Sequence, residues 1–353
     1  MVPIRRMMVA FALLALFPAC GKKSSPTQPA NEQPGASIYI SGYYEISSRW
    51  YSCYWQGTTR YELPGDGTHN TSANSIAVSG TTVYTGGSFN NGTWNVPCYW
   101  AGTTRHDLPT GTGHSDVYAM ALSSGTFYGA GYSFGAAGSL HNTPCYWQGS
   151  TMHVLPADTS QDGEATGIAV DGGTIYCSGH INSTGGSGSD PCFWVGDVKY
   201  ELPHDTANTS YASGIAVSGG TAYTCGFYII NGRRIPCYWQ ETVRTDLPGN
   251  GTNSASAYAI CVSGGTVYVA GYAHDGGKRV PCYWAGTTRH DLPGGSGFDN
   301  YAYAVTVVNG TVYCAGSIDN GTRRVPCYWA GTTRYELPVD STANGYASGI
   351  LVQ

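Results

Sequence analysis

The tripeptide Cys-Tyr-Trp recurs seven times along this chain, and its spacing constrains the fold more than any other feature. The copies are separated by 45 or 47 residues and begin at Cys53, Cys98, Cys145, Cys192 (as Cys-Phe-Trp), Cys237, Cys282 and Cys327. A fixed period of this size is typical of solenoids, propellers and other arrays of one repeated unit. The sequence therefore predicts seven copies of one supersecondary structure.

Each repeat is expected to contain four short strands. In the unit around Cys282, the segments 258–265, 266–272, 279–284 and 288–293 are rich in β-branched or aromatic residues and are bounded by turn-forming residues. Four-stranded sheets repeated about an axis make a β-propeller. The fold class predicted here is all-β, a seven-bladed propeller with four antiparallel strands in each blade.

The two ends of the repeat region predict how the ring closes. Residues 37–42 match the second strand of a unit, whereas residues 346–352 match the first strand. The last strand should therefore join the N-terminal blade, which hides two strand edges. This arrangement uses every predicted strand and assigns residues 37–353 to one seven-bladed β-propeller.

The units with the sequences TVYVAGY and PCYWAGTTR resemble repeats of bacterial secreted or lipoprotein β-propellers, and they are loosely similar to kelch repeats. The resemblance covers nearly all of residues 37–353. Kelch units carry a Gly pair after the second strand, and here only Gly86-Gly87 follows that pattern. The resemblance implies a propeller fold and a surface location, and it implies no activity.

The first 36 residues are expected to lie outside the propeller. Arg5 and Arg6 precede an apolar run, Met7 to Phe17, which is too short to span a bilayer. The run ends in Phe17-Pro18-Ala19-Cys20, which resembles a bacterial lipobox, although an ordinary secretory signal cut near Ala19 is the alternative. We predict a signal peptide at 1–19, and at 20–36 a lipidated Cys20 followed by a flexible tether.

A lipidated N-terminus would anchor the protein in the bacterial cell envelope, outside the cytoplasm. The lipid bilayer of the outer membrane or cell surface would then be one partner. Loss of a leader that contains Arg5 and Arg6 would change the formal net charge from −5 to −7, which argues against nucleic-acid binding. No Cys/His cluster has the spacing of a zinc site, and no motif indicates a cofactor.

Eleven cysteines remain if Cys20 carries lipid. The seven repeat cysteines are expected to be small buried side chains at a fixed packing position. Pairs on neighbouring strands, such as Cys177–Cys192 or Cys314–Cys327, are the alternative in an oxidising compartment.

The loops are expected to divide between two faces of the ring. Turns between the first and second strands, and between the third and fourth, are short and uniform. Loops between the second and third strands, and connections to the next blade, vary in length and chemistry, as in 133–142, 181–190 and 229–234. Rigid scaffolds usually carry recognition on such loops, so we expect any binding site on this variable face.

Lysine and arginine beyond the tether occupy two repeat positions. Six lie on outermost strands, each two residues before an acid, a pattern that protects sheet edges from aggregation. The other seven lie in variable-face hairpins of the adjoining blades 5, 6, 7 and 1, and we call them the basic arc: Arg49, Arg233, Arg234, Lys278, Arg279, Arg323 and Arg324. The basic arc is a candidate site for an anionic glycan or an acidic protein. The alternative is that these are solvated charges, partly paired with Asp275 and Asp319.

Tyrosines form a second candidate. Tyr118, Tyr258 and Tyr303 share one position on the innermost strands, which line the channel. Their rings can stack on a sugar while the hydroxyls form hydrogen bonds, or they can simply pack between blades.

We expect a non-enzymatic, membrane-anchored scaffold that binds a glycan or a protein on its variable face. An envelope-assembly lipoprotein is one alternative. A glycan-cleaving enzyme is another, in which Asp116, Glu164 or Asp299 would meet at the channel mouth as a pair of carboxylates.

Overall fold

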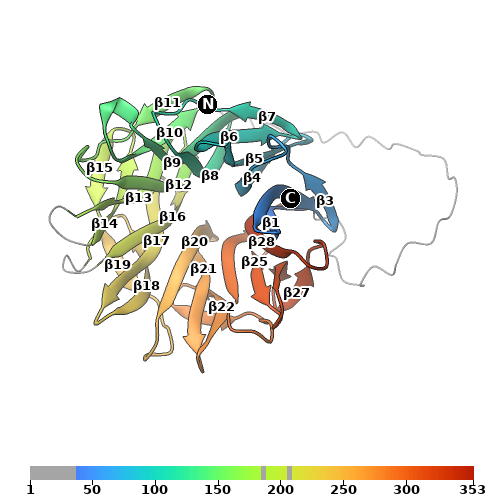
Figure 1. Cartoon of the computed structure of the whole chain (residues 1–353). Coiled ribbons are helices and arrows are strands. Elements are labelled where there is room, and N and C mark those ends of the chain that lie inside the picture. The colour runs from blue at the N-terminus through green and yellow to red at the C-terminus, as the bar shows by residue number, and fades with distance from the viewer. Residues whose placement is uncertain (1–36, 184–187, 205–208) are drawn as a thin grey trace, which may run out of the picture. The chain divides into compact units, whose positions relative to one another are not determined.

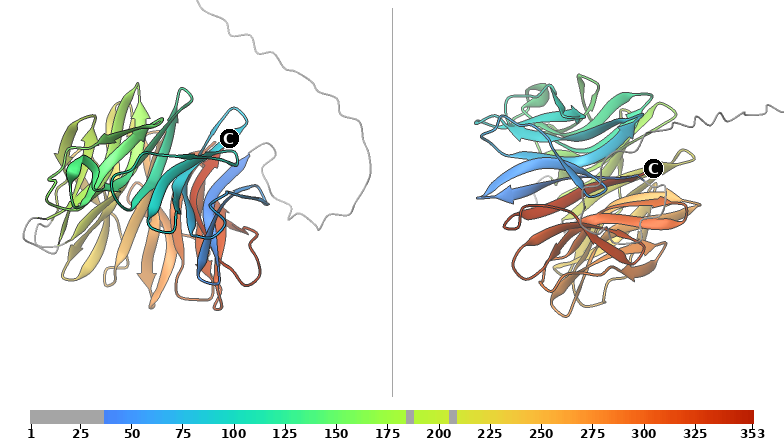
Figure 2. Two further views of the ribbon diagram at one scale, coloured as in Figure 1. Left: turned by 45° about the horizontal axis from the view of Figure 1, so that its top comes forward. Right: turned by 90° about the vertical axis from the view of Figure 1, so that its right-hand side faces the viewer.

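Seven four-stranded antiparallel sheets form a ring around a central axis (Figure 1). The computed structural model describes residues 37–183, 188–204 and 209–353, so the predicted signal peptide, Cys20 and tether lie outside the described residues. The predicted seven-bladed propeller is confirmed. In side view the sheets stand around the axis, with loops at both faces (Figure 2).

The innermost strands are β4 (Thr71–Ser79), β8 (Ser115–Ser123), β12 (Gly163–Asp171), β16 (Ser210–Ser218), β20 (Ala255–Ser263), β24 (Tyr301–Val308) and β28 (Asn344–Val352). The second strands are β1 (Ile38–Ile46), β5 (Thr82–Asn90), β9 (Thr126–Phe134), β13 (Thr174–Asn182), β17 (Thr221–Ile230), β21 (Thr266–Asp275) and β25 (Thr311–Asp319). The third strands are β2 (Arg49–Gln56), β6 (Asn95–Ala101), β10 (Asn142–Gln148), β14 (Ser189–Val195), β18 (Arg233–Gln240), β22 (Lys278–Ala285) and β26 (Arg324–Ala330). The outermost strands are β3 (Thr59–Glu62), β7 (Thr104–Asp107), β11 (Thr151–Val154), β15 (Val198–Glu201), β19 (Val243–Asp246), β23 (Thr288–Asp291) and β27 (Thr333–Glu336).

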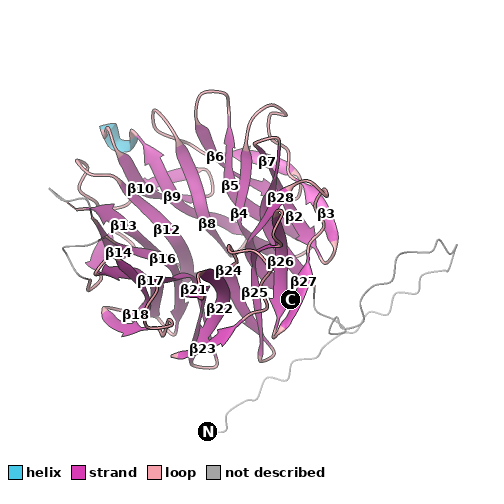
Figure 3. Cartoon of the chain, turned by 60° about the horizontal axis from the view of Figure 1, so that its bottom comes forward, coloured by secondary structure: helices cyan, strands magenta, loops and turns pink. Residues whose placement is uncertain are grey.

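Helical structure in the described part of the chain is limited to one short turn, η1 (Ala136–Gly138), in the loop between β9 and β10 (Figure 3). Within those residues no helix has the length and apolar character needed to cross a membrane.

Blade 1 closes the ring as the sequence predicts. Its innermost strand β28 pairs antiparallel with β1, so Tyr346 lies opposite Tyr43. The backbone N–H of Ser37 donates to the carbonyl of Gln353 at 2.8 Å, and the N–H of Gln353 returns a bond of 3.0 Å. Two segments far apart in sequence therefore share one sheet, which removes the exposed edge that each would otherwise present.

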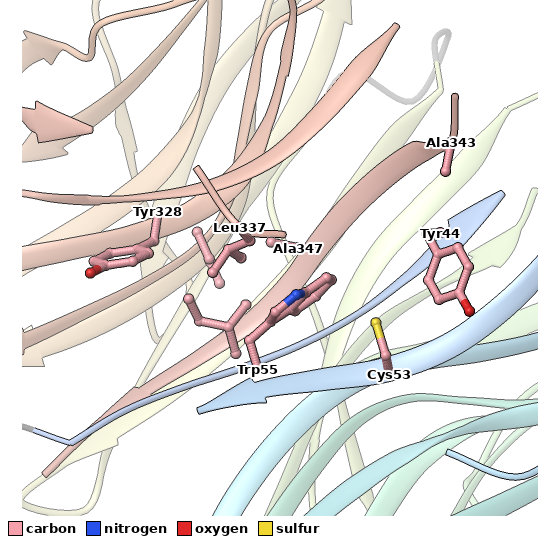
Figure 4. Packing of buried hydrophobic residues seen from close by; sticks show 10 residues of the cluster. Tyr44, Cys53, Trp55, Tyr328, Leu337, Ala343 and Ala347 are labelled. Atoms are coloured by element: carbon pink, nitrogen blue, oxygen red, sulfur yellow. The ribbon is translucent and has the colours of Figure 1, made fainter. Parts of the chain in front are cut away.

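The Cys-Tyr-Trp repeat lies in the core and connects neighbouring blades. All seven repeat tryptophans are fully buried, and each indole N–H donates to a proline carbonyl of the preceding blade at 2.8–3.1 Å. Figure 4 shows one such junction, where Trp55 and Cys53 of blade 1 pack near Leu337 and Tyr328. Each buried indole therefore has its polar atom paired while its ring fills the space between sheets.

The repeat cysteines pack against glycine. Each lies opposite a glycine on the second strand, as Cys282 lies opposite Gly271. A Cβ on Gly271 would meet the backbone oxygen of Ser256 at 1.9 Å, so only glycine fits there. All eleven cysteines of the described residues are free, and neither alternative disulfide is formed. Cys177 lies opposite Trp194 and Cys192 opposite Gly179, so these two thiols do not face each other.

Outer-edge charges form ion pairs within their own strands. Each of the six basic residues forms an ion pair with the acid two residues later: Arg60, Arg105, Lys199, Arg244, Arg289 and Arg334. Exposed pairs of this kind contribute about 0–1 kcal/mol, so their role here is to keep charge on the sheet edge.

Every innermost strand contains a bulge at the same position. The register against the second strand shifts by one residue there, which leaves one residue of each blade without a cross-strand partner: Asn74, Tyr118, Thr166, Ser213, Tyr258, Tyr303 and Ser348. These side chains line a channel cavity of about 350 Å³. Bulges re-aim side chains, and here they create a ring whose chemistry differs from blade to blade.

Candidate binding face

The mouth of the channel on the variable face is built from one cross-strand pair in each blade. Just before the bulge, an innermost residue faces a second-strand residue. The pairs are Tyr346/Tyr43, Ser72/Ser88, Asp116/Tyr132, Glu164/His180, Tyr211/Phe227, Ser256/Tyr272 and Tyr301/Ser317 in blades 1 to 7. We call these fourteen residues the channel mouth. They come from the same register positions, so the fold fixes their place and the sequence of each blade decides their chemistry.

A third residue per blade joins the channel mouth from the third strand, three positions before each repeat cysteine. In blades 1 to 7 it is Trp50, Asn95, Asn142, Ser189, Arg234, Arg279 and Arg324. Six of these contact channel-mouth residues of their own or a neighbouring blade. Ser189 instead donates its hydroxyl to Asn182 at 2.9 Å.

The basic arc divides into two sets, which the sequence analysis did not separate. Neighbouring residues of a strand point to opposite sides. Arg234, Arg279 and Arg324 therefore face the channel mouth, whereas the residues just before them bond to loop carbonyls of the next blade. Arg233 donates to the carbonyl of Gly251. Lys278 donates to that of Ser296 at 2.8 Å, and Arg323 to that of Ala343 at 3.0 Å. Arg49 occupies the same outward position and lies over its own Tyr51.

Arg279 and Arg324 share one carboxylate at the channel mouth. Asp299, from the connection between β23 and β24, forms ion pairs with both guanidinium groups, at 2.7 Å for Arg324. Asp275 and Asp319, the partners that the alternative of solvated charges named, form no ion pair within the described residues. Two cations and one anion leave this cluster with a net positive charge.

Aromatic rings surround the Arg279–Asp299–Arg324 cluster. The guanidinium carbons of Arg279 and Arg324 each lie 5.3 Å from the ring centroid of Tyr301. Arg324 also lies 5.7 Å from Tyr346, which stacks on Tyr43 at 4.9 Å. Side-chain exposures of 32% for Arg279 and 23% for Arg324 leave both groups within reach of a ligand. This half of the channel mouth combines cation–π contacts with charged donors.

The predicted tyrosines lie inside the channel, at the bulges. Tyr258 and Tyr303 of neighbouring blades have ring centroids 5.6 Å apart, which agrees with the alternative that these rings pack between blades. Tyr118 is separate from them and bonds to Glu164. Burial raises the pKa of all three phenols well above the usual value, so they are neutral hydrogen-bonding groups at physiological pH.

Blades 3 and 4 place carboxyl groups where blades 5 to 7 place aromatic or serine side chains. Asp116 is only 9% exposed, and burial raises its pKa above the usual value. Burial also raises the pKa of Glu164, helped by the negative charge of Asp116. Asp116 and Glu164 occupy the same register position in neighbouring blades, whereas the third candidate carboxylate, Asp299, pairs with the two arginines.

Sequence reasoning missed Trp50 and Tyr43 at the channel mouth. It compared blades by charge and by innermost-strand tyrosines, and neither criterion includes these two. Trp50 lies three residues before its repeat cysteine, as Arg279 and Arg324 do, so an alignment of the repeats at that position would have identified it.

In residues 37–183, 188–204 and 209–353, no group of three or more His, Cys, Asp or Glu side chains is placed to hold a metal ion.

Comparison with protein-family models finds no match, and neither does comparison with curated proteins. Among solved structures, the computationally designed Ika8 protein is similar at 15% sequence identity and a TM-score of 0.45. The similarity covers 88% of this chain and 90% of that one. It is too low to support any argument about function.

Proposed function

We propose that this protein is a glycan-binding lipoprotein of a bacterial cell envelope, and that it recognises an anionic glycan at the channel mouth. The observation that supports this most directly is the Arg279–Asp299–Arg324 cluster against Tyr301 and Tyr346. Guanidinium groups bind carboxylate or sulfate in forked geometry, and tyrosine rings stack on sugars. The excess positive charge favours an anionic ligand over a neutral one.

The anchoring part of the proposal is supported by the lipobox-like segment that ends in Cys20. A diacylated or triacylated Cys20 should be found by mass spectrometry of the N-terminal peptide from bacterial membranes. An unmodified N-terminus generated near Ala19 would contradict lipidation of Cys20 and would indicate a secreted protein.

The binding part is tested with the detergent-solubilised full chain and a panel of carboxylated and sulfated oligosaccharides. Replacing both Arg279 and Arg324 with Gln should weaken binding at least about tenfold, or 1.4 kcal/mol. It should also reduce the dependence of affinity on salt. Arg289→Gln is the matched control, because this arginine also pairs with an aspartate but lies on the outermost strand of blade 6.

Unchanged affinity in the double variant would contradict the proposal. If no oligosaccharide binds, the envelope-assembly alternative becomes the better explanation of the asymmetric charged face.

A glycan-cleaving enzyme is a second candidate, and one observation favours it. Asp116 and Glu164 occupy the same register position in the neighbouring blades 3 and 4, and burial raises the pKa of both carboxyl groups. A raised pKa is what a general acid in glycoside hydrolysis requires. The same oligosaccharide incubations should be assayed for new reducing ends. Their appearance with the wild type, and their loss in Glu164→Gln, would support cleavage.

A further inference from the structure

A pocket of about 240 Å³ opens at the channel mouth between blades 1, 2 and 3. Pockets for drug-sized ligands usually measure about 300–1,000 Å³, so this one suits a single small ring. It is lined by residues of β1, β2, β4, β5, β6 and β8, and by Asn70 just before β4. Among the described residues, no lysine or arginine lines it, in contrast to the arginine-rich half of the mouth.

One wall of the pocket is aromatic. Trp50 and Tyr43 have ring centroids 5.4 Å apart and an interplanar angle of 31°. Trp50 is 41% exposed, whereas the seven repeat tryptophans are completely buried. Its backbone N–H donates to Asn70 Oδ1 at 3.0 Å, which ties the start of β2 to the next blade. An indole held in place with its ring toward solvent provides a platform for the apolar face of a ligand.

The opposite wall is polar, and hydrogen bonds hold it in one arrangement. Asn95 Nδ2 donates to Asp116 Oδ2 at 3.1 Å, and Asn90 Nδ2 donates to Asn95 Oδ1 at the same distance. Ser88 donates a further hydrogen bond to Asp116 and lies 3.3 Å from the Ser72 hydroxyl. The acceptor and donor groups of this wall are therefore positioned before a ligand arrives, which reduces the entropic cost of binding.

Asp116 is unusual because it is buried at this pocket without an ion pair, although the imidazole of His114 acts to lower the pKa of its carboxyl. Across the described residues it forms no ion pair, whereas Asp299 forms two. A buried carboxyl group without a charged partner is costly unless hydrogen-bond donors satisfy it. Ligand hydroxyl groups are such donors. A ligand carrying its own negative charge would be repelled from this position.

We infer that this pocket binds one uncharged, hydroxyl-rich sugar ring, with Trp50 and Tyr43 against its apolar face and Asp116 and Asn95 against its hydroxyl groups. The inference rests on the proposed function, because it adds a neutral subsite to the same glycan-binding face.

The neutral subsite and the arginine cluster adjoin. Tyr43 lines the pocket and stacks on Tyr346, and Tyr346 lies beneath the guanidinium of Arg324. A glycan that crosses this boundary would place an uncharged ring in the pocket and an anionic group against Arg324 and Arg279. The ligand class is therefore an acidic oligosaccharide that contains at least one neutral sugar.

The test uses the detergent-solubilised full chain and a panel of neutral methyl hexopyranosides and methyl N-acetylhexosaminides. Intrinsic tryptophan fluorescence provides the readout, because Trp50 is the exposed indole at the pocket. At least one glycoside should change the fluorescence with a Kd in the millimolar range, about −4 kcal/mol. Calorimetric titration of the same glycoside should show Trp50→Ala weakening binding more than about tenfold, and Trp50→Phe retaining most of it.

Three further variants define the site. Asp116→Ala should also weaken binding more than about tenfold, because hydroxyl groups lose their charged acceptor. Trp94→Ala is the matched control: it removes the tryptophan at the neighbouring register position of blade 2, which does not line the pocket. Arg289→Gln, on the outermost strand of blade 6, should leave neutral glycoside binding unchanged.

Two results would overturn the inference. One is that no neutral glycoside binds at about 50 mM, far above a millimolar Kd. The other is that binding occurs but persists in both Trp50→Ala and Asp116→Ala. Neither result affects the proposed anionic site, which fails separately if the arginine double variant still binds acidic oligosaccharides.

Discussion

The two halves of the channel mouth use the same register positions for opposite chemistry. In blades 5 to 7 the third-strand position is arginine, and Asp299 is held between two of these side chains. In blades 2 and 3 the same position is asparagine, and Asp116 is held by an amide and a hydroxyl. The charge of Asp299 is balanced by two arginines, whereas Asp116 is held by hydrogen bonds from neutral groups. The difference shows that the chemistry of this surface depends on single side chains set on a uniform ring.

The largest expected effect is on the free energy of unfolding when the carboxylate of Asp299, which pairs with two arginines, is removed. Asp299→Asn should lower the free energy of unfolding by about 2 kcal/mol, because two adjacent guanidinium groups lose their shared acceptor. Asp116→Asn should change it by less than about 0.5 kcal/mol or stabilise the fold, since an amide there avoids a buried unpaired charge. Urea unfolding of both variants measures the comparison. Equal losses would show that the two carboxylates are equally well compensated.

An intermediate effect is expected from giving blade 2 the arginine of blade 6. Asn95→Arg places a guanidinium beside Asp116, so it should lower the pKa of that carboxyl and fill the pocket below Trp50. Neutral glycoside binding should fall more than about tenfold. Asn142→Arg, the equivalent change in blade 3, is the control because Asn142 does not line the pocket. If both variants bind the glycoside as well as the wild type, the ring is not seated beside Asn95.

The smallest expected effect is on the pH dependence of stability. The folded-state pKa values of Asp116 and Glu164 are raised, so between the unfolded value near 4 and the folded value the native state binds more protons. The free energy of unfolding should therefore fall as pH rises through this window, and then level off. In the Asp116→Asn, Glu164→Gln double variant, the free energy of unfolding should not show this decrease with pH, as measured by thermal unfolding. The variant with Gln at positions 279 and 324 should retain it.

The sequence predicted the scaffold better than the surface. Repeat spacing and strand-like segments were sufficient for seven blades and for closure by β28, because local patterns determine both. The alternation of side chains along an extended chain also separates Arg279 and Arg324 from the preceding Lys278 and Arg323, a difference that their shared charge conceals.

The pairing of Asp299 could not be read from the sequence. It lies in an irregular connection, where no periodic rule fixes the direction of a side chain. The same holds for Asn70, which precedes β4 and reaches the start of β2 from the next blade. Contacts between blades depend on three-dimensional packing, so the repeat predicts that blades touch but not which polar groups meet.

Closure of blade 1 determines when, during folding, the proposed binding face is complete. β28 supplies Tyr346, which joins Arg324 of blade 7 to Tyr43 of blade 1, and Tyr43 in turn forms part of the pocket wall. The surface that joins the arginine cluster to the pocket therefore does not exist until the first and last blades have met. If the proposed glycan binds here, its binding reports that folding is finished, because a chain stalled with an open ring would lack this joined surface.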